Sequence, residues 1–165
     1  MTRCAEIETT EGSFVAEFSS RGLKRLEFPG KKTARKSSAT PQAALDPRQQ
    51  RWLQLTESAV NDVMAGRKPR ALPPMDWEGC TEFQQTVWRA LLRISPGETK
   101  TYAAIGKVLG KPLAARAIGG ACGANPIPVL VPCHRVLAAN GRLGGFSGGL
   151  GWKRRLLAIE GVEAK

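Results

Sequence analysis

The chain has 165 residues, 42% of them hydrophobic, which is enough to bury the core of one ordinary domain or two small ones and excludes a disordered chain. Twenty-five Lys and Arg against fourteen Asp and Glu give a net charge of +11, which favours a polyanionic partner because each neutralised phosphate releases counterions. Residues 1–80 carry 13 basic and 10 acidic side chains, whereas residues 81–165 carry 12 and 4. The second half is therefore the better candidate for an anion-binding site.

The cysteines and the histidine limit metal chemistry. Four cysteines are widely spaced, at Cys4, Cys80, Cys122 and Cys133, and no pair has Cys-x-x-Cys spacing. Because His134 is the only histidine, a zinc finger or a His-rich site is excluded, and we expect no bound metal. The sequence shows no secretory or membrane-spanning pattern, so we expect a cytoplasmic protein with reduced thiols and no membrane partner.

The first third of the chain follows a strand pattern and then a helix pattern. Apolar and polar residues alternate between residues 3 and 28, which predicts short strands. Residues 30–46 are polar, include four basic side chains, and predict a long loop. Apolar residues at helical spacing from Trp52 to Met64 predict a helix that ends at Gly66.

A connector with two adjacent prolines, Pro73 and Pro74, separates this part from a second one in which helical patterns dominate. We therefore predict an α+β chain, with a small N-terminal α/β domain over residues 1–78 and a mainly helical C-terminal domain over residues 79–165.

The second part predicts several short helices. An apolar stripe over residues 83–92 indicates a helix with Thr81 as its N-cap. Two shorter helices are predicted over residues 102–109 and 113–123, and their Gly-containing connection matches a helix-turn-helix outline, although many such pairs are only scaffolding. The second of them consists mainly of Ala and Gly, with Arg116 as its one long cation. This composition fits either close helix packing or a low-profile surface lying in a nucleic-acid groove.

Cys133 and His134 are adjacent and follow Pro132. A thiol becomes a strong nucleophile when a base lowers its pKa, and His134 can be that base. Neighbouring side chains on an extended segment point to opposite sides, so we expect a bridging water to link the two. Glu160, at the end of a helix predicted over residues 150–159, is the better placed of two downstream carboxylates to orient the histidine. Taken singly, each residue is more often structural, as a buried thiol or a satisfied core histidine.

These residues belong to a longer pattern that resembles the O6-alkylguanine-DNA alkyltransferases. The resemblance covers about the last 85 residues. The segments that carry it, in the same order as in the family, are Arg116–Ala121, Gly123–Pro126, Val131–Val136, Gly145–Leu150 and Leu156–Gly161.

The resemblance implies direct DNA repair. Cys133 would take the alkyl group from guanine O6 and keep it as a thioether, so that each molecule acts once and needs no cofactor; O4-methylthymine would be a second substrate. The partner would be double-stranded DNA that contains alkylated guanine, bound by a monomer with the target base flipped out of the stack. The implied fold is an N-terminal domain with a ribonuclease-H-like outline and a C-terminal domain of winged helix-turn-helix type.

The resemblance also assigns catalytic roles by position. Cys133 is the alkyl acceptor, His134 the water-mediated base and Glu160 its orienting carboxylate. Asn125 supports the turn of the active site. Tyr102 donates to the guanine ring and helps to rotate the nucleotide.

Further positions would contact DNA or the flipped base. Arg116 would occupy the space that the base leaves in the duplex, which offsets part of the cost of flipping. The other expected DNA contacts are Tyr102, Ala103, Lys111, Ala115 and Arg135. The expected pocket for the base is formed by Val136, Ser147 and Phe146.

Some features depart from the family pattern. The first 80 residues match it mainly in outline, and the chain lacks the histidines of the structural zinc site that some members have. Phe146 stands where some relatives have tyrosine, which predicts an altered tolerance for bulky adducts. Two other hypotheses stay open: a DNA-binding module that senses alkylated bases without repairing them, and a thiol hydrolase, which would regenerate Cys133.

Overall fold

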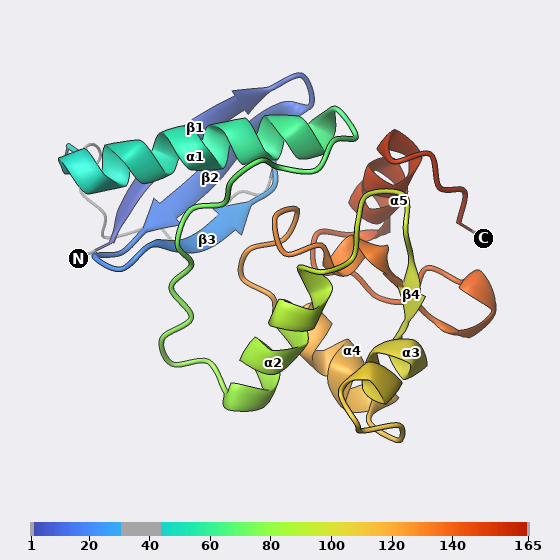
Figure 1. The fold of residues 1–165 in the computed structure, drawn as a ribbon. Helices are drawn as coiled ribbons and strands as arrows, with labels where there is room; N and C mark the ends of the chain where they lie inside the picture. Colours follow the sequence, from blue (N-terminus) through green and yellow to red (C-terminus); the bar gives the residue numbers. More distant parts are fainter. Residues whose placement is uncertain (1, 31–43, 165) are drawn as a thin grey trace.

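The computed structural model describes residues 2–30 and 44–164, so the loop predicted over residues 30–46 lies largely outside the described residues. Figure 1 shows two parts: a β-sheet crossed by one long helix, and a group of shorter helices below the sheet and to its right. A long connector joins the two parts, and the two termini lie at opposite sides of the molecule (Figure 1).

The N-terminal part is a three-stranded antiparallel sheet in the order β1-β2-β3. Its strands are β1 (Arg3–Thr9), β2 (Gly12–Phe18) and β3 (Leu23–Glu27), so the strands predicted between residues 3 and 28 are present. Helix α1 (Pro47–Met64) packs on the sheet and begins five residues before the predicted apolar stripe. Its start is fixed by Asp46, whose side chain accepts a hydrogen bond from the backbone of the third helical residue.

The proline-rich connector is attached to the edge of the sheet. The backbone N–H of Leu23 donates to Pro74 O at 2.8 Å, and Asp76 N donates to Leu23 O at 2.8 Å, which gives an isolated parallel bridge. Gly22 lies against this bridge, and a Cβ there would overlap the carbonyl oxygen of Pro74. Only glycine leaves room for this approach.

Four helices and a pair of very short strands form the C-terminal part. They are α2 (Glu82–Leu91), β4 (Lys100–Thr101), α3 (Tyr102–Val108), α4 (Ala115–Gly123), β5 (Val136–Leu137) and α5 (Leu150–Ile159). Strands β4 and β5 pair in parallel. Thr81 caps α2 as predicted, and α5 has the predicted bounds. Helix α4 begins at Ala115, two residues later than predicted, and Ala114 before it provides no side-chain cap.

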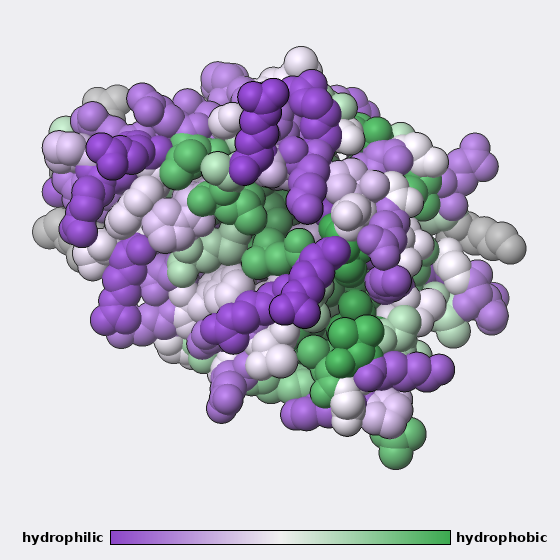
Figure 2. Space-filling model, in the orientation of Figure 1, coloured by the Kyte–Doolittle hydropathy of each residue, from purple (hydrophilic) through white to green (hydrophobic). Residues whose placement is uncertain are grey.

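The two parts share one hydrophobic core. Buried residues of β2, β3 and α1 belong to the same cluster as Trp88 of α2 and Ile118 of α4. The indole of Trp88 also donates to Ala121 O at 2.9 Å, which joins α2 to α4. On the face shown in Figure 2, hydrophobic residues gather in a central band and hydrophilic ones surround it. In the described part of the chain, no helix combines the length and apolar character needed to cross a membrane.

Replacing Gly22 by Ala is expected to destabilise the fold by about 1–3 kcal/mol, because the new methyl group would force apart two backbone segments. The matched control is Gly151→Ala, at an exposed position of α5 where an added Cβ meets nothing within 4 Å. The control should be neutral or slightly stabilising, since alanine favours helix more than glycine does. Urea denaturation measures both; equal midpoints for the two variants would contradict this packing.

Candidate active site

Cys133 lies in a tight turn, which corrects the extended conformation expected from the sequence. Residues Cys133–Arg135 form one turn of 3-10 helix (η1) directly before β5. Cys133 N donates to Val131 O at 2.8 Å and Arg135 N donates to Pro132 O at 3.0 Å. The pattern Pro-Cys-His gave no signal of this turn, because it depends on backbone hydrogen bonds that the residue types do not specify.

Asn125 joins the two ends of the segment that leads to the thiol. Its amide nitrogen donates to Val131 O at 2.9 Å, and its amide oxygen accepts from Ile127 N at 2.9 Å. Asn125 is 5% exposed, and its side chain opposes the rise in the pKa of Cys133 that burial causes. The resemblance assigned Asn125 to the support of this turn, and the structure places its side chain between the backbones of Ile127 and Val131.

Glu160, at the C-terminal end of α5, accepts hydrogen bonds from two neighbouring side chains. Its Oε1 lies 3.0 Å from Nε2 of His134, and the guanidinium of Arg135 contacts both of its oxygens at 2.6 to 3.1 Å. Arg135 also donates to Ile94 O at 2.6 Å. The three side chains are between 0% and 6% exposed.

This burial does not agree with the DNA contact expected for Arg135. The guanidinium of Arg135 is held inside the protein by Glu160 and by the carbonyl of Ile94. A basic residue next to the motif looks like a phosphate contact in sequence, but the carboxylate that binds it is 25 residues away in the chain.

Burial and hydrogen bonding shift three pKa values in this cluster. Burial raises the pKa of Cys133 to about 11, against the opposing effects of Asn125 and Lys153, so the resting thiol is protonated. Burial lowers the pKa of His134, although Glu160 opposes the shift, so the imidazole is neutral at pH 7. Burial alone would raise the pKa of Glu160, but the hydrogen bonds from His134 and Arg135 outweigh it and lower the pKa to about 2.

Lys153 was not among the residues predicted for the site. This lysine is 0% exposed, and its Nζ donates to Val136 O at 2.8 Å and to Gly145 O at 3.3 Å. It therefore ties β5 to the loop that precedes α5. A signal was present: Lys153 stands three and four residues before Leu156 and Leu157, on the apolar face of its helix.

A cavity of about 480 Å³ brings together residues from three separated segments. Tyr102 comes from α3, Ala115 and Arg116 from α4, and Phe146 from the loop before α5. The remaining lining residues are Gly119, Gly123 and Gly145, which have no side chains to fill the cavity. Four residues that the sequence assigned to DNA or base contacts therefore line one space.

The remaining expected contacts lie near this cavity or on the surface. Ser147, next to Phe146, lines a separate cavity of about 260 Å³ together with Asn125. Val136 is fully buried beside the reaction centre. Ala103 and Lys111 are exposed, and the ammonium of Lys111 lies 5.1 Å from the ring centroid of Phe83.

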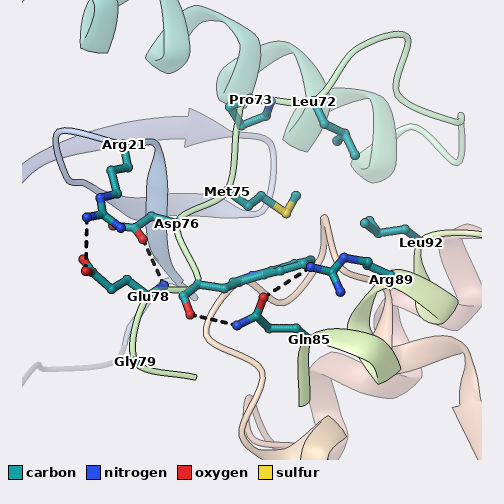
Figure 3. Close-up of a pocket in the computed structure, with 11 residues that line it drawn as sticks. Arg21, Leu72, Pro73, Met75, Asp76, Glu78, Gly79, Gln85, Arg89 and Leu92 are labelled. Atoms are coloured by element: carbon teal, nitrogen blue, oxygen red, sulfur yellow. Dashed lines mark hydrogen bonds and ion pairs between the residues drawn. The ribbon is translucent and has the colours of Figure 1, made fainter. Parts of the chain in front are cut away.

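The cavity shown in Figure 3 has a larger volume, about 690 Å³, but none of the residues predicted for the site. It lies between the connector and α2. Arg21 and Glu78 in its lining pair at 3.2 Å (Figure 3). Arg89 lies 5.8 Å from the ring centroid of Trp77, so these charged groups already have partners. Cavity size therefore does not locate the chemistry in this fold.

Several known proteins are similar to this chain in sequence and in structure. The family described as 6-O-methylguanine DNA methyltransferase, DNA binding domain, matches residues 82–162. A crystal structure of Mycobacterium tuberculosis O6-methylguanine methyltransferase superposes with a TM-score of 0.74 at 34% identity, over 97% of this chain and 93% of the other. The chain belongs to the O6-methylguanine DNA methyltransferase family.

Two further comparisons describe its place in this family. The methylated-DNA–protein-cysteine methyltransferase of M. tuberculosis is 48% identical over 105 residues, which is 64% of this chain and 63% of that relative. The match therefore spans less than two thirds of the length of this relative. A crystal structure of M. tuberculosis OGT in complex with DNA superposes with a TM-score of 0.76 at 34% identity, over 96% of this chain and 91% of the other.

Replacing Glu160 by Gln is expected to flatten the dependence of stability on acid pH. The pKa of Glu160 is about 2 in the fold against an ordinary 4.5, so its contribution is complete above pH 4.5 and is lost as the pH falls towards 2. The lowered pKa of His134 acts with the same sign, because its contribution is lost as the pH falls through the ordinary value of 6.5.

Denaturant titrations at pH 7 and pH 3 measure this effect. The unfolding free energy of the original chain should fall by about 2 kcal/mol more than that of the Glu160→Gln variant. Glu163→Gln, which removes an exposed carboxylate three residues away, should retain the pH dependence of the original chain. A parallel loss of stability in all three proteins would show that Glu160 is not the group responsible.

Proposed function

We propose that this chain repairs alkylated DNA by transferring the alkyl group of O6-alkylguanine to Sγ of Cys133, and that O4-methylthymine is a second substrate. The observation that carries the proposal is the buried Cys133 next to the His134–Glu160 pair, in a chain that belongs to this family. The structure of M. tuberculosis OGT in complex with DNA supports DNA as the partner, and we propose that this DNA is double-stranded.

The transfer requires a base, because burial keeps the thiol of Cys133 protonated at neutral pH. His134 can accept this proton on Nδ1, which is buried and without a hydrogen-bond partner among the described residues, while Glu160 holds Nε2. A water between Sγ and Nδ1 would relay the proton. Glu160 stays ionised and fixes the imidazole with Nε2 protonated.

The atoms of the reaction balance without a cofactor. Sγ attacks the alkyl carbon, the bond between this carbon and O6 breaks, and the guanine leaves with the proton that the thiol gave up. The product is a thioether, which no group in the site can cleave, so each molecule reacts once. This single use separates the proposal from a thiol hydrolase, which regenerates its cysteine.

Base flipping follows from the geometry of the target. A guanine O6 inside a stacked duplex is out of reach of a buried thiol, so the nucleotide must rotate out at a cost of about a few kcal/mol. Tyr102 and Arg116 line one cavity, where Tyr102 would contact the flipped base and Arg116 would fill the space left behind. Val136, Ser147 and Phe146 would complete the pocket.

The DNA-binding surface would consist of α3, α4 and their short connection, acting as a winged helix-turn-helix. Ala103, Lys111 and Ala115 would approach the backbone, and the small side chains of α4 would allow close contact with the minor groove. Arg135, buried as it is, is better suited to hold Glu160 in place. Domain boundaries at residues 1–78 and 79–165, a ribonuclease-H-like N-terminal outline, a monomer and a cytoplasmic location stay predictions.

Intact mass after mixing with a duplex that contains one O6-methylguanine tests the reaction. We expect each protein to gain one methyl group in place of one hydrogen, mapped to Cys133 and saturating at one per molecule. Cys133→Ala should show no gain yet retain DNA binding. Binding without any mass change in the original chain would favour the sensor hypothesis, and repeated turnover would favour the hydrolase.

Replacing Arg116 by Ala is expected to slow repair in a duplex by more than about tenfold, because the flipped-out state loses the side chain that stabilises it. Reaction with free O6-benzylguanine needs no flipping and should change by less than about twofold. Single-turnover kinetics on both substrates measure the difference. The matched control is Arg51→Ala, at an exposed position of α1, which should leave both rates unchanged. Equal losses on both substrates for Arg116→Ala would refute its role in flipping.

A further inference from the structure

Aromatic rings join the N-terminal sheet to the loop that carries Phe146. Phe28, directly after β3, is 4% exposed, and its ring centroid lies 5.7 Å from that of Phe146 and 4.8 Å from that of Trp152 in α5. Phe14 of β2 lies deeper, 5.6 Å from Phe28 and 5.7 Å from Trp152. Phe28 therefore connects Phe14 of the N-terminal part to Phe146. Figure 1 shows the sheet, which contains Phe14, and α5, which follows Phe146 in the sequence.

The backbone of the loop before α5 lies against the rings of Phe28 and Phe146. A Cβ at Gly148 would lie 2.5 Å from the ring of Phe28 and 2.9 Å from the ring of Phe146. Both rings therefore touch the chain where a side chain would have stood, and neither can shift towards the loop. Because interiors are close-packed, the position of Phe146 depends on that of Phe28.

The strand that ends before Phe28 also contacts the other side of the reaction centre. Leu26 N donates to Pro126 O at 3.0 Å, next to Asn125, whose side chain hydrogen bonds to the backbone of Ile127 and Val131 ahead of Cys133. Phe28, Asn125 and Ser147 line the cavity of about 260 Å³, whereas Phe146 lines the cavity of about 480 Å³ that holds Tyr102 and Arg116. Phe28 thus contacts Phe146 without lining the larger cavity itself.

We propose that Phe28 determines which O6 substituents the site accepts, by holding the Phe146 ring as a fixed wall of the pocket. The inference rests on the proposed function and concerns the size of the adduct, not the transfer itself. A methyl group reaches Cys133 whether or not this wall can move. A benzyl group needs the space that the wall occupies, so its rate depends on how firmly Phe28 supports Phe146.

The test compares Phe28→Leu with Phe14→Leu. Each variant replaces one buried ring of the same cluster by an aliphatic side chain, but Phe28 is the one whose contact with Phe146 is lost. Rates are measured with O6-benzylguanine and O6-methylguanine in the same duplex, so that DNA binding cancels in their ratio. For Phe28→Leu the benzyl-to-methyl ratio should rise about fivefold, the order expected from the loss of one aromatic pair. For Phe14→Leu it should change by less than about twofold.

A second variant acts on the same wall from the loop. Gly148→Ala inserts a methyl group against both rings and should displace Phe146 into the pocket, which lowers the benzyl-to-methyl ratio. Adding Phe28→Leu to this variant removes one of the two clashes and should restore the ratio. This comparison remains informative if Phe28→Leu alone folds poorly.

The outcomes separate this proposal from the proposed function. If both substrates slow by the same factor in Phe28→Leu, and Gly148→Ala leaves the ratio unchanged, Phe28 only stabilises the fold and the proposal is wrong. If the original chain transfers neither group to Cys133, the proposed function itself is wrong.

Discussion

The site depends on one buried carboxylate, Glu160, which accepts hydrogen bonds from two neighbouring side chains at once. Glu160 accepts from the imidazole of His134 and from the guanidinium of Arg135, and the latter also binds the carbonyl of Ile94. Removing either donor would leave a buried charge without full compensation, which is strongly destabilising. This interaction fixes the end of α5 against the turn that carries the thiol of Cys133. The position of the thiol and the stability of the fold therefore depend on the same contacts.

The surroundings of the Cys133 thiol act on its ionisation in opposite directions. Burial opposes ionisation of Cys133, while Asn125 and Lys153 favour the thiolate. Lys153 also holds Val136 and Gly145 through their carbonyl oxygens, so one buried side chain both ties β5 to the loop before α5 and lowers the pKa of the thiol. Burial lowers the pKa of His134, so its imidazole is neutral at pH 7 and chemically able to accept a proton.

Local signals in the sequence predicted local structure well. The cap at Thr81 and the full extent of α5 followed from residue types and spacing. Contacts between distant residues were harder to predict. The partner of Arg135 is 25 residues away, and the rings around Phe28 meet only after the sheet packs on the loop before α5. No periodicity within one element encodes such pairs.

The shared core limits how this molecule can be divided. Strand β3 donates a backbone hydrogen bond to Pro126, and Phe28 covers both Phe146 and Trp152. A fragment that starts after the connector would keep Cys133, His134 and Glu160. It would nevertheless expose these two aromatic rings and leave the carbonyl of Pro126 without its protein donor. Sequence similarity concentrated in the C-terminal half thus follows the side chains around Cys133, whereas the packing that holds them in place extends into the N-terminal sheet.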